Sequence, residues 1–142
     1  MPLTLPPSGY LDANGPFFAK RAGDDIIIGL RIEPRHCNAI GIAHGGMILT
    51  LADVLLTVGS NIRARTSRFL PTVNVTCDFI GPAKQGDWIE GRIEVLKVTK
   101  SYVFSQALLQ TDVARPVARI SGVLIVRGDP DPAFAPERYF GG

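Results

Sequence analysis

The chain is poor in the residues that form disulfides, bind metals or act as catalytic bases. Its 142 residues include two cysteines, Cys37 and Cys77, and two histidines, His36 and His44. With no recognisable secretory signal ahead of them, two cysteines favour free structural thiols over a disulfide. The histidines and Cys37 match no recognised ligand spacing, and we therefore expect no metal site.

Sequence motifs that identify several common enzyme classes are also absent. The chain contains no Gly-x-Ser-x-Gly nucleophile elbow, which argues against a serine hydrolase of that type. It has no glycine-rich phosphate loop followed by lysine and no dinucleotide-binding fingerprint. These absences argue against a phosphate-loop enzyme and against a dinucleotide-dependent one.

Charge and hydropathy give little reason to expect a nucleic acid or a membrane as partner. The formal net charge is +2, from 15 Lys and Arg and 13 Asp and Glu, and the basic residues are scattered. Residues 1–7 lack a cationic region and a long apolar run, and we expect no segment that spans a bilayer. The prediction is a cytoplasmic protein.

The length of the chain predicts one domain over residues 1–142. A chain of this size can bury a substantial core without disulfides. Proline and glycine are frequent in residues 1–15, and prolines recur in residues 128–142. We expect both end segments to be irregular, and the N-terminal arm to be able to fold over a ligand.

Residues 43–60 form the most apolar stretch of the chain and predict a buried helix that ends near residues 61–65. Apolar residues cover nearly its whole circumference, which is typical of a helix surrounded by other structure. Asp53 is its only charged residue between His44 and Arg63. Because a buried carboxylate is costly unless it is hydrogen-bonded or neutral, Asp53 calls for a functional or structural reason.

The remaining segments predict strands. Residues 17–22 and 26–33 flank a turn at 23–25 and indicate a hairpin. Four further strands are predicted, and their short connections favour an antiparallel meander. Their ranges are 72–80, 88–98, 102–110 and 116–126. Since only one helix is available to cover the sheet, the predicted class is α+β, with a curved antiparallel sheet wrapped around a long central helix.

Small and polar residues recur along one face of this helix at spacings of three and four. They are Gly46, Thr50, Asp53, Thr57 and Ser60. Two interpretations are open at this point. The stripe is either a working surface, or a set of hydroxyls that satisfies Asp53 within a core or a polar subunit interface.

Gly45 and Gly46 stand at the predicted start of the helix. Backbone N–H groups at a helix N-terminus favour negative charge, so a developing oxyanion would suit this place, although a tight turn would also need glycine. Gly45 and Asp53 are eight residues apart, which is about 12 Å along one helix. They could act on one reacting carbonyl only if they came from two copies, so catalysis predicts at least a dimer.

Residues 17–127 resemble the hotdog-fold thioesterases, specifically the phenylacetate-pathway (PaaI-like) acyl-CoA thioesterases. The specific part of the resemblance is Asn38-x5-His44-Gly45-Gly46-x6-Asp53. The strand at 72–80 and the turn at 81–87 support it. The resemblance implies an acyl-CoA hydrolase with sites at a dimer interface, and pairing of dimers into tetramers is part of the same expectation.

The resemblance also implies roles for individual residues. Asp53 would be the nucleophile or the general base on water, and the Gly45 N–H of the partner would polarise the thioester carbonyl. Asn38 and His44 would orient substrate or water in the neighbouring subunit. A hydroxyl beside the attacking water is implied at either of two positions, Thr57 or Thr72.

Substrate contacts are expected from Gly46 and Thr50 on the helix, and the basic residues Arg63 and Lys84 are candidates for the CoA phosphates. Solvated surface charge is the alternative for either basic residue. Thioester hydrolysis needs no metal or organic cofactor, and CoA enters as part of an aromatic or medium-to-long acyl substrate. Alternative functions are a non-catalytic acyl-CoA-binding or regulatory module and a hydratase or dehydratase of the same fold.

Overall fold

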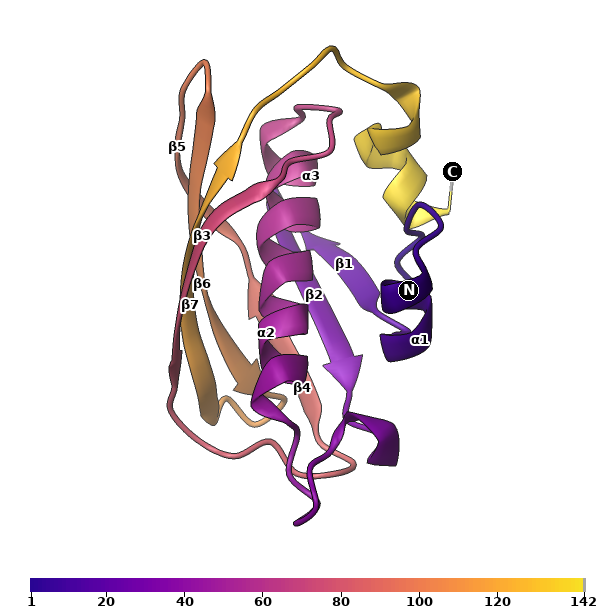
Figure 1. Ribbon diagram of the computed structural model, residues 1–142, viewed down its shortest axis with the longest axis vertical. Helices are drawn as coiled ribbons and strands as arrows, with labels where there is room; N and C mark the ends of the chain where they lie inside the picture. Colours follow the sequence, from indigo (N-terminus) through magenta and orange to yellow (C-terminus); the bar gives the residue numbers. More distant parts are fainter. Residues whose placement is uncertain (142) are drawn as a thin grey trace.

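An antiparallel sheet that curves around one long helix is the main feature of the structure, a computed structural model that describes residues 1–141 (Figure 1). The seven strands are β1 (Phe18–Ala22), β2 (Asp25–Arg31), β3 (Thr72–Phe79), β4 (Trp88–Arg92), β5 (Glu94–Val98), β6 (Tyr102–Thr111) and β7 (Pro116–Ile125). The long helix consists of α2 (Gly45–Val54), η2 (Leu55–Gly59) and α3 (Ser60–Ala64). The expected α+β architecture is therefore confirmed.

The order of the strands differs from the simple meander that the short connections favoured. The order is β1-β2-β4-β6-β7-β3, with β5 paired to β6, so β3 lies at the far edge and not beside β4. The predicted strand at 88–98 is two strands, which pair with the two halves of β6. They separate at Ile93, whose side chain is buried in the core. Burial still alternates across this break, since Ile89, Gly91 and Ile93 are all buried, and the register of β5 against β6 shifts between Val95 and Lys97.

The long helix contains one turn of π-helix, η2, which the sequence did not predict. In a π-turn each hydrogen bond reaches one residue further than in an α-helix, so residues beyond it change their angular position. Ser60 follows this turn and is fully buried, and its hydroxyl lies 2.6 Å from the Ser105 hydroxyl of β6. Ser60 therefore faces the sheet, and its expected place on the polar stripe with Asp53 is wrong.

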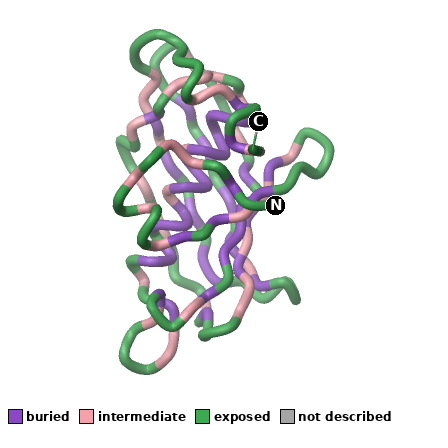
Figure 2. The backbone as a smooth tube through the Cα atoms, turned by 90° about the vertical axis from the view of Figure 1, so that its right-hand side faces the viewer, coloured by how far each residue is buried: buried purple, intermediate pink, exposed green. Residues whose placement is uncertain are grey.

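Two glycines in the sheet allow the helix to lie close to it. A Cβ atom on Gly91 of β4 would come within 2.6 Å of Leu55 Cδ2, and one on Gly122 of β7 within 2.7 Å of Leu56 Cδ1. Both leucines are completely buried. In Figure 2 the buried residues run along the middle of the molecule while exposed residues occupy the loops. The core is thus the contact between the helix and the concave face of the sheet.

The expectation that no segment is long and apolar enough to span a bilayer is wrong. Gly45–Ala64 meets that test by length and composition. Two thirds of the tested window is buried inside the protein, because the helix packs against the concave face of the sheet. A core helix of this kind satisfies the same criterion as a membrane span.

The two end segments contain short helices where the sequence suggested irregular structure. Helix α1 (Gly9–Asn14) begins after Ser8, whose hydroxyl accepts a hydrogen bond from the Leu11 N–H. The C-terminal segment forms two 3-10 helices, η3 (Pro132–Phe134) and η4 (Pro136–Phe140). The Thr4 N–H donates to the Tyr139 carbonyl at 2.9 Å. The two ends therefore lie together, on the side of the helix away from the sheet (Figure 1).

Both cysteines are free thiols, as expected. Cys77 on β3 is half-buried, and burial together with the neighbouring Asp78 carboxylate raises the pKa of its thiol. The protonated thiol is a poor nucleophile, which agrees with a structural role.

Gly91→Ala is expected to lower the free energy of unfolding by about 1–3 kcal/mol, because the added methyl group must displace buried leucine side chains from a close-packed core. Gly9→Ala is the matched control, since a Cβ atom there would meet no other atom within 4 Å. Urea unfolding of both variants measures the difference. Equal stability of Gly91→Ala and the wild type would contradict the close approach of helix and sheet.

Candidate active site

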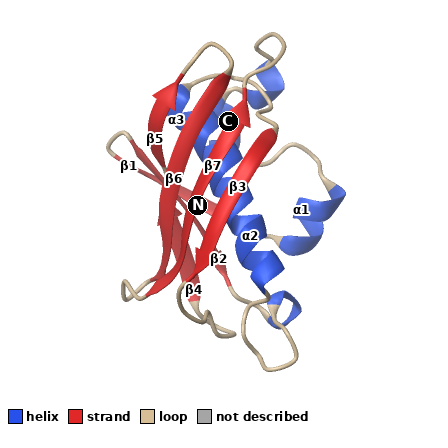
Figure 3. Cartoon of the chain, turned by 60° about the vertical axis from the view of Figure 1, so that its left-hand side comes forward, coloured by secondary structure: helices blue, strands red, loops and turns tan. Residues whose placement is uncertain are grey.

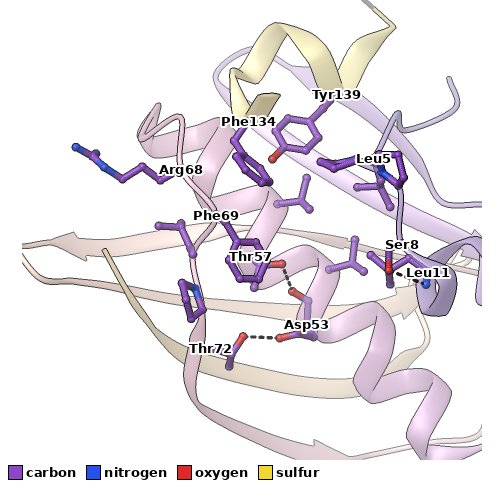
Figure 4. Close-up of a pocket in the computed structure, with 16 residues that line it drawn as sticks. Leu5, Ser8, Leu11, Asp53, Thr57, Arg68, Phe69, Thr72, Phe134 and Tyr139 are labelled. Carbon is purple, nitrogen blue, oxygen red and sulfur yellow. Dashed lines mark hydrogen bonds between the residues drawn. The ribbon is translucent and has the colours of Figure 1, made fainter. Parts of the chain in front are cut away.

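Asp53 lies near the end of α2, half-buried at the place where the helix passes the beginning of β3. Thr72 is the first residue of β3, and its hydroxyl donates a hydrogen bond of 2.6 Å to Asp53 Oδ1 (Figure 4). A hydrogen bond to a charged acceptor is stronger than one between neutral groups. The sheet edge thus fixes one oxygen of the only charged side chain in α2 and η2.

The two threonine candidates make different contacts with Asp53. The Thr57 hydroxyl donates at 2.7 Å to the main-chain carbonyl of Asp53, one turn back along the helix. It does not bond the carboxylate, whereas Thr72 does. The geometry therefore favours Thr72 over Thr57 as the hydroxyl beside a reacting carboxylate.

A cavity of about 510 Å³ opens beside Asp53 (Figure 4). Its walls come from the helix, from the segment before β3 and from both end segments of the chain. The lining residues are Leu5, Pro6, Pro7, Ser8, Leu11, Asp53, Val54, Thr57, Val58, Arg68, Phe69, Leu70, Pro71, Thr72, Phe134 and Tyr139. A cavity of this size that is mostly apolar and has a few polar groups is typical of small-molecule sites.

The start of the helix carries the candidate oxyanion donors. His44 is the N-cap residue, and its Nδ1 accepts a hydrogen bond of 2.9 Å from the Gly46 N–H. The Gly46 donor is therefore occupied. Gly45 is the first helical residue, and its N–H has no acceptor within the helix. Of the two glycines, Gly45 is the one whose N–H is left for a ligand.

Asn38 and Lys84 lie close to this helix start. Asn38 Oδ1 accepts hydrogen bonds from the N–H groups of Ile40 and Ile42, at 3.1 and 3.2 Å, and so holds the loop before the helix. Ile42 in turn forms a β-bridge with Lys84. The loop before α2 and the turn between β3 and β4 are thereby joined. Lys84 is exposed beside the candidate oxyanion site.

Within one chain the acid and the candidate oxyanion donor are not brought together. Asp53 lines the 510 Å³ cavity, whereas His44 and Gly46 line a separate hollow of about 360 Å³. This agrees with the distance of about 12 Å expected for eight residues along a helix. The separation is consistent with the expectation that Asp53 and the start of the helix cannot act on one carbonyl within a single subunit.

Two expected substrate contacts, Thr50 and Arg63, do not line the Asp53 cavity. Thr50 is buried, donates to the Gly46 carbonyl at 2.9 Å and bonds the Tyr10 hydroxyl at 2.7 Å, so helix α1 covers it. Arg63 lines a different hollow, beside Arg92 and Glu94. Helix α1 thus covers Thr50, and Arg63 lies on α3 beyond the π-turn.

His36 and Cys37 do not form part of a metal centre in the part of the chain that the structure describes, where no group of three or more potential ligands occurs. His36 is buried, and both of its ring nitrogens have partners. Nδ1 accepts from the Glu33 N–H at 3.0 Å, and Nε2 lies 2.8 Å from the Asn14 carbonyl. His36 thus joins the end of α1 to the loop before the long helix.

Asn61 and the C-terminal aromatics form a part of the site that sequence reasoning missed. Asn61 of α3 is buried, and its Nδ2 donates to the Phe134 carbonyl at 2.8 Å and to the Tyr139 hydroxyl at 3.0 Å. Burial raises the pKa of the Tyr139 hydroxyl. Aromatic residues in a proline-containing tail were the available signal, but nothing in the sequence says where such a tail docks.

Comparison with known proteins relates the chain to thioesterases. Residues 40–113 match the family model described as thioesterase superfamily. A Pseudomonas aeruginosa protein that bears the provisional name of esterase is 39% identical over 82% of this chain and 87% of its own length. Human acyl-coenzyme A thioesterase 13 is 32% identical over 72% of this chain and 68% of its own length.

Solved structures share the fold at lower sequence identity. A mutant of the phenylacetic acid degradation protein PaaI from Thermus thermophilus superposes with a TM-score of 0.72 at 19% identity, over 84% of this chain and all of that chain. A hypothetical thioesterase from Streptococcus pneumoniae, solved with coenzyme A, has a TM-score of 0.72 at 16% identity and covers 81% of this chain and 91% of its own.

The raised pKa of Tyr139 predicts a loss of stability in alkali. A tyrosine in the unfolded chain ionises near pH 10, whereas the buried Tyr139 keeps its proton to higher pH. Above pH 10 the unfolded state therefore binds fewer protons, and the free energy of unfolding falls as pH rises. Tyr139→Phe is expected to show a smaller fall between pH 9 and 11 in urea unfolding. Identical slopes for variant and wild type would argue against the buried hydroxyl.

Proposed function

Because the chain belongs to the thioesterase superfamily, as a PaaI-like hotdog thioesterase, we propose that it hydrolyses acyl-CoA thioesters with aromatic or medium-to-long acyl groups. The observation that carries the proposal is a carboxylate held by Thr72 at one end of a mostly apolar cavity. The names of the human relative and of the coenzyme A-bound structure support CoA as the thiol part of the substrate.

Asp53 supplies the reactive carboxylate in this proposal. Thr72 occupies Oδ1, which leaves Oδ2 for the reaction. As a general base, Asp53 removes a proton from water, the water oxygen attacks the carbonyl carbon, and the C–S bond breaks to release the CoA thiolate. As a nucleophile, Oδ2 attacks the carbonyl carbon, the C–S bond breaks to release the CoA thiolate, and water then hydrolyses the resulting anhydride to free acid and the Asp53 carboxylate. Both routes give free acid and CoA without a metal or an organic cofactor.

The oxyanion of either route needs a donor from a second subunit. The Gly45 N–H stands at the positive end of the helix dipole, about 12 Å from Asp53 of the same chain. In a two-fold dimer with antiparallel helices, Gly45 of one subunit would face Asp53 of the other. Asn38, His44 and Gly46 would accompany Gly45 to that site, and Lys84 beside them would be a contact for a CoA phosphate.

The edge of the sheet supports pairing of two chains. Strand β3 pairs with β7 on one side, and among residues 1–141 no strand pairs its other side (Figure 3). Val73, Phe79 and Ile80 on or next to β3 are each more than half exposed. An edge strand with exposed apolar side chains is a template for pairing with another strand. A dimer across β3 would cover these groups, and further pairing would give a tetramer.

Asp53→Asn is expected to reduce kcat by about 10²–10⁴-fold with a smaller change in KM, because the amide keeps the shape of the carboxylate but neither accepts a proton nor attacks a carbonyl. Release of free thiol from a panel of acyl-CoA esters measures the effect. Asp24→Asn in the exposed hairpin turn is the matched control. Wild-type turnover in Asp53→Asn would refute the role of Asp53, and binding without turnover in the wild type would favour a non-catalytic module.

A mixture of two inactive variants tests the shared site. Gly45→Pro removes the candidate donor at the first helical position, where proline is tolerated and where the preceding His44 already has ψ of 138°. A hybrid dimer of Gly45→Pro with Asp53→Asn contains one intact site. Random pairing makes half of the dimers hybrid, so co-refolding is expected to recover about a quarter of the wild-type specific activity.

Size-exclusion chromatography confirms that the mixed sample forms the same assembly as the wild type. Each variant refolded alone serves as the control for residual activity. Absence of recovery in hybrids that have formed would contradict a site built from Asp53 and Gly45 of different subunits, while leaving hydrolysis by Asp53 itself untouched.

A further inference from the structure

We infer that the C-terminal segment of this chain closes the acyl end of the cavity, so that Phe134 sets the length of the hydrocarbon tail that the protein accepts. The tail is an uncharged medium-length alkyl or aryl group. The identity of the CoA ester rests on the proposed function. Phe134 and Tyr139 form the wall that closes the cavity, and both lie outside the region 40–113 that the family model matches.

Each polar side chain that lines the cavity already has at least one hydrogen-bond partner within the protein. Thr72 bonds the Asp53 carboxylate, Thr57 the Asp53 carbonyl, Ser8 the Leu11 N–H and Tyr139 the Asn61 amide. The Arg68 guanidinium donates to the carbonyls of Gly128 and Thr66. The mostly apolar surface beyond Asp53 therefore suits a hydrocarbon, since a charged or multiply hydroxylated tail would lose its hydration and gain few partners in return.

Asp53 and the C-terminal aromatics lie at opposite ends of the cavity, with Phe69 between them (Figure 4). The rings of Phe69 and Phe134 pack at a centroid distance of 6.0 Å. Asn61 lies eight residues after Asp53, which is about 12 Å along the helix axis. Because Asn61 bonds the Phe134 carbonyl and the Tyr139 hydroxyl, it places these two residues at about that distance along the helix from Asp53. The aromatics are therefore placed to stop a tail whose carbonyl lies at Asp53.

Asn61 also makes this wall rigid. Besides its two bonds to the C-terminal segment, its Oδ1 accepts hydrogen bonds from the Thr66 hydroxyl and the Arg68 N–H. One buried amide thus joins the helix, the segment before β3 and the C-terminal segment. A wall held on three sides limits length more sharply than a mobile loop does, because little backbone movement is available to admit further carbon atoms.

Binding of alkyl-CoA thioethers tests the wall without requiring hydrolysis. Affinity for the hexyl, octyl, decyl and dodecyl compounds is measured by calorimetry for wild type, Phe134→Ala and Phe134→Trp. Up to the limit of the wild-type cavity, each methylene is expected to tighten binding by roughly fourfold, and beyond it the gain stops. Phe134→Ala should move that limit to longer chains, and Phe134→Trp to shorter ones.

Tyr102→Ala, on the exposed outer face of the sheet, is the aromatic control and should keep the wild-type limit. Opposite shifts in the two Phe134 variants cannot arise from misfolding and would support the inference. The same limit in all variants, or affinity that is independent of chain length, would overturn it. Thioester turnover is measured separately, so a wild-type protein that shows the length limit but releases no thiol refutes hydrolysis and supports the wall.

Discussion

The rest of the structure depends on a single packing constraint, namely that one sheet must cover one apolar helix. The helix is apolar around most of its circumference, and the sheet meets this demand by curving around it. Gly91 and Gly122 remove side chains where Leu55 and Leu56 press against the strands. Since the sheet covers one side, the edge at β3 and the side facing the chain termini are left for other contacts.

This constraint decides where polar chemistry can occur. A carboxylate on such a helix is tolerable at the seam between helix and sheet edge, where Thr72 can bond it. The N-terminal end of the helix is the other polar place, and the helix length keeps the two apart. A second copy would bring them together, so the same elements that make the core of one subunit would form the active-site wall of two.

The end segments complete the site although they lie outside the matched family region. They contribute the apolar cavity walls on the side of the helix that the sheet leaves open, and the buried Asn61 amide holds the C-terminal part in place. The residues proposed for hydrolysis thus come from the central helix and the sheet, whereas the end segments line the cavity beyond them. Acyl preference could therefore vary among relatives without any change in Asp53 or Gly45.

Periodicity by itself determined the helix, most strand positions and the isolation of Asp53, because burial imposes periods of 3.6 and 2 directly on the residues. Helix length by itself also separated Gly45 from Asp53. Only the tertiary structure decided the place of β3 beside β7, the break at Ile93, the π-turn that turns Ser60 to the sheet, and the choice of Thr72 over Thr57 as partner of the carboxylate. These features depend on contacts between segments distant in sequence, which no local pattern records.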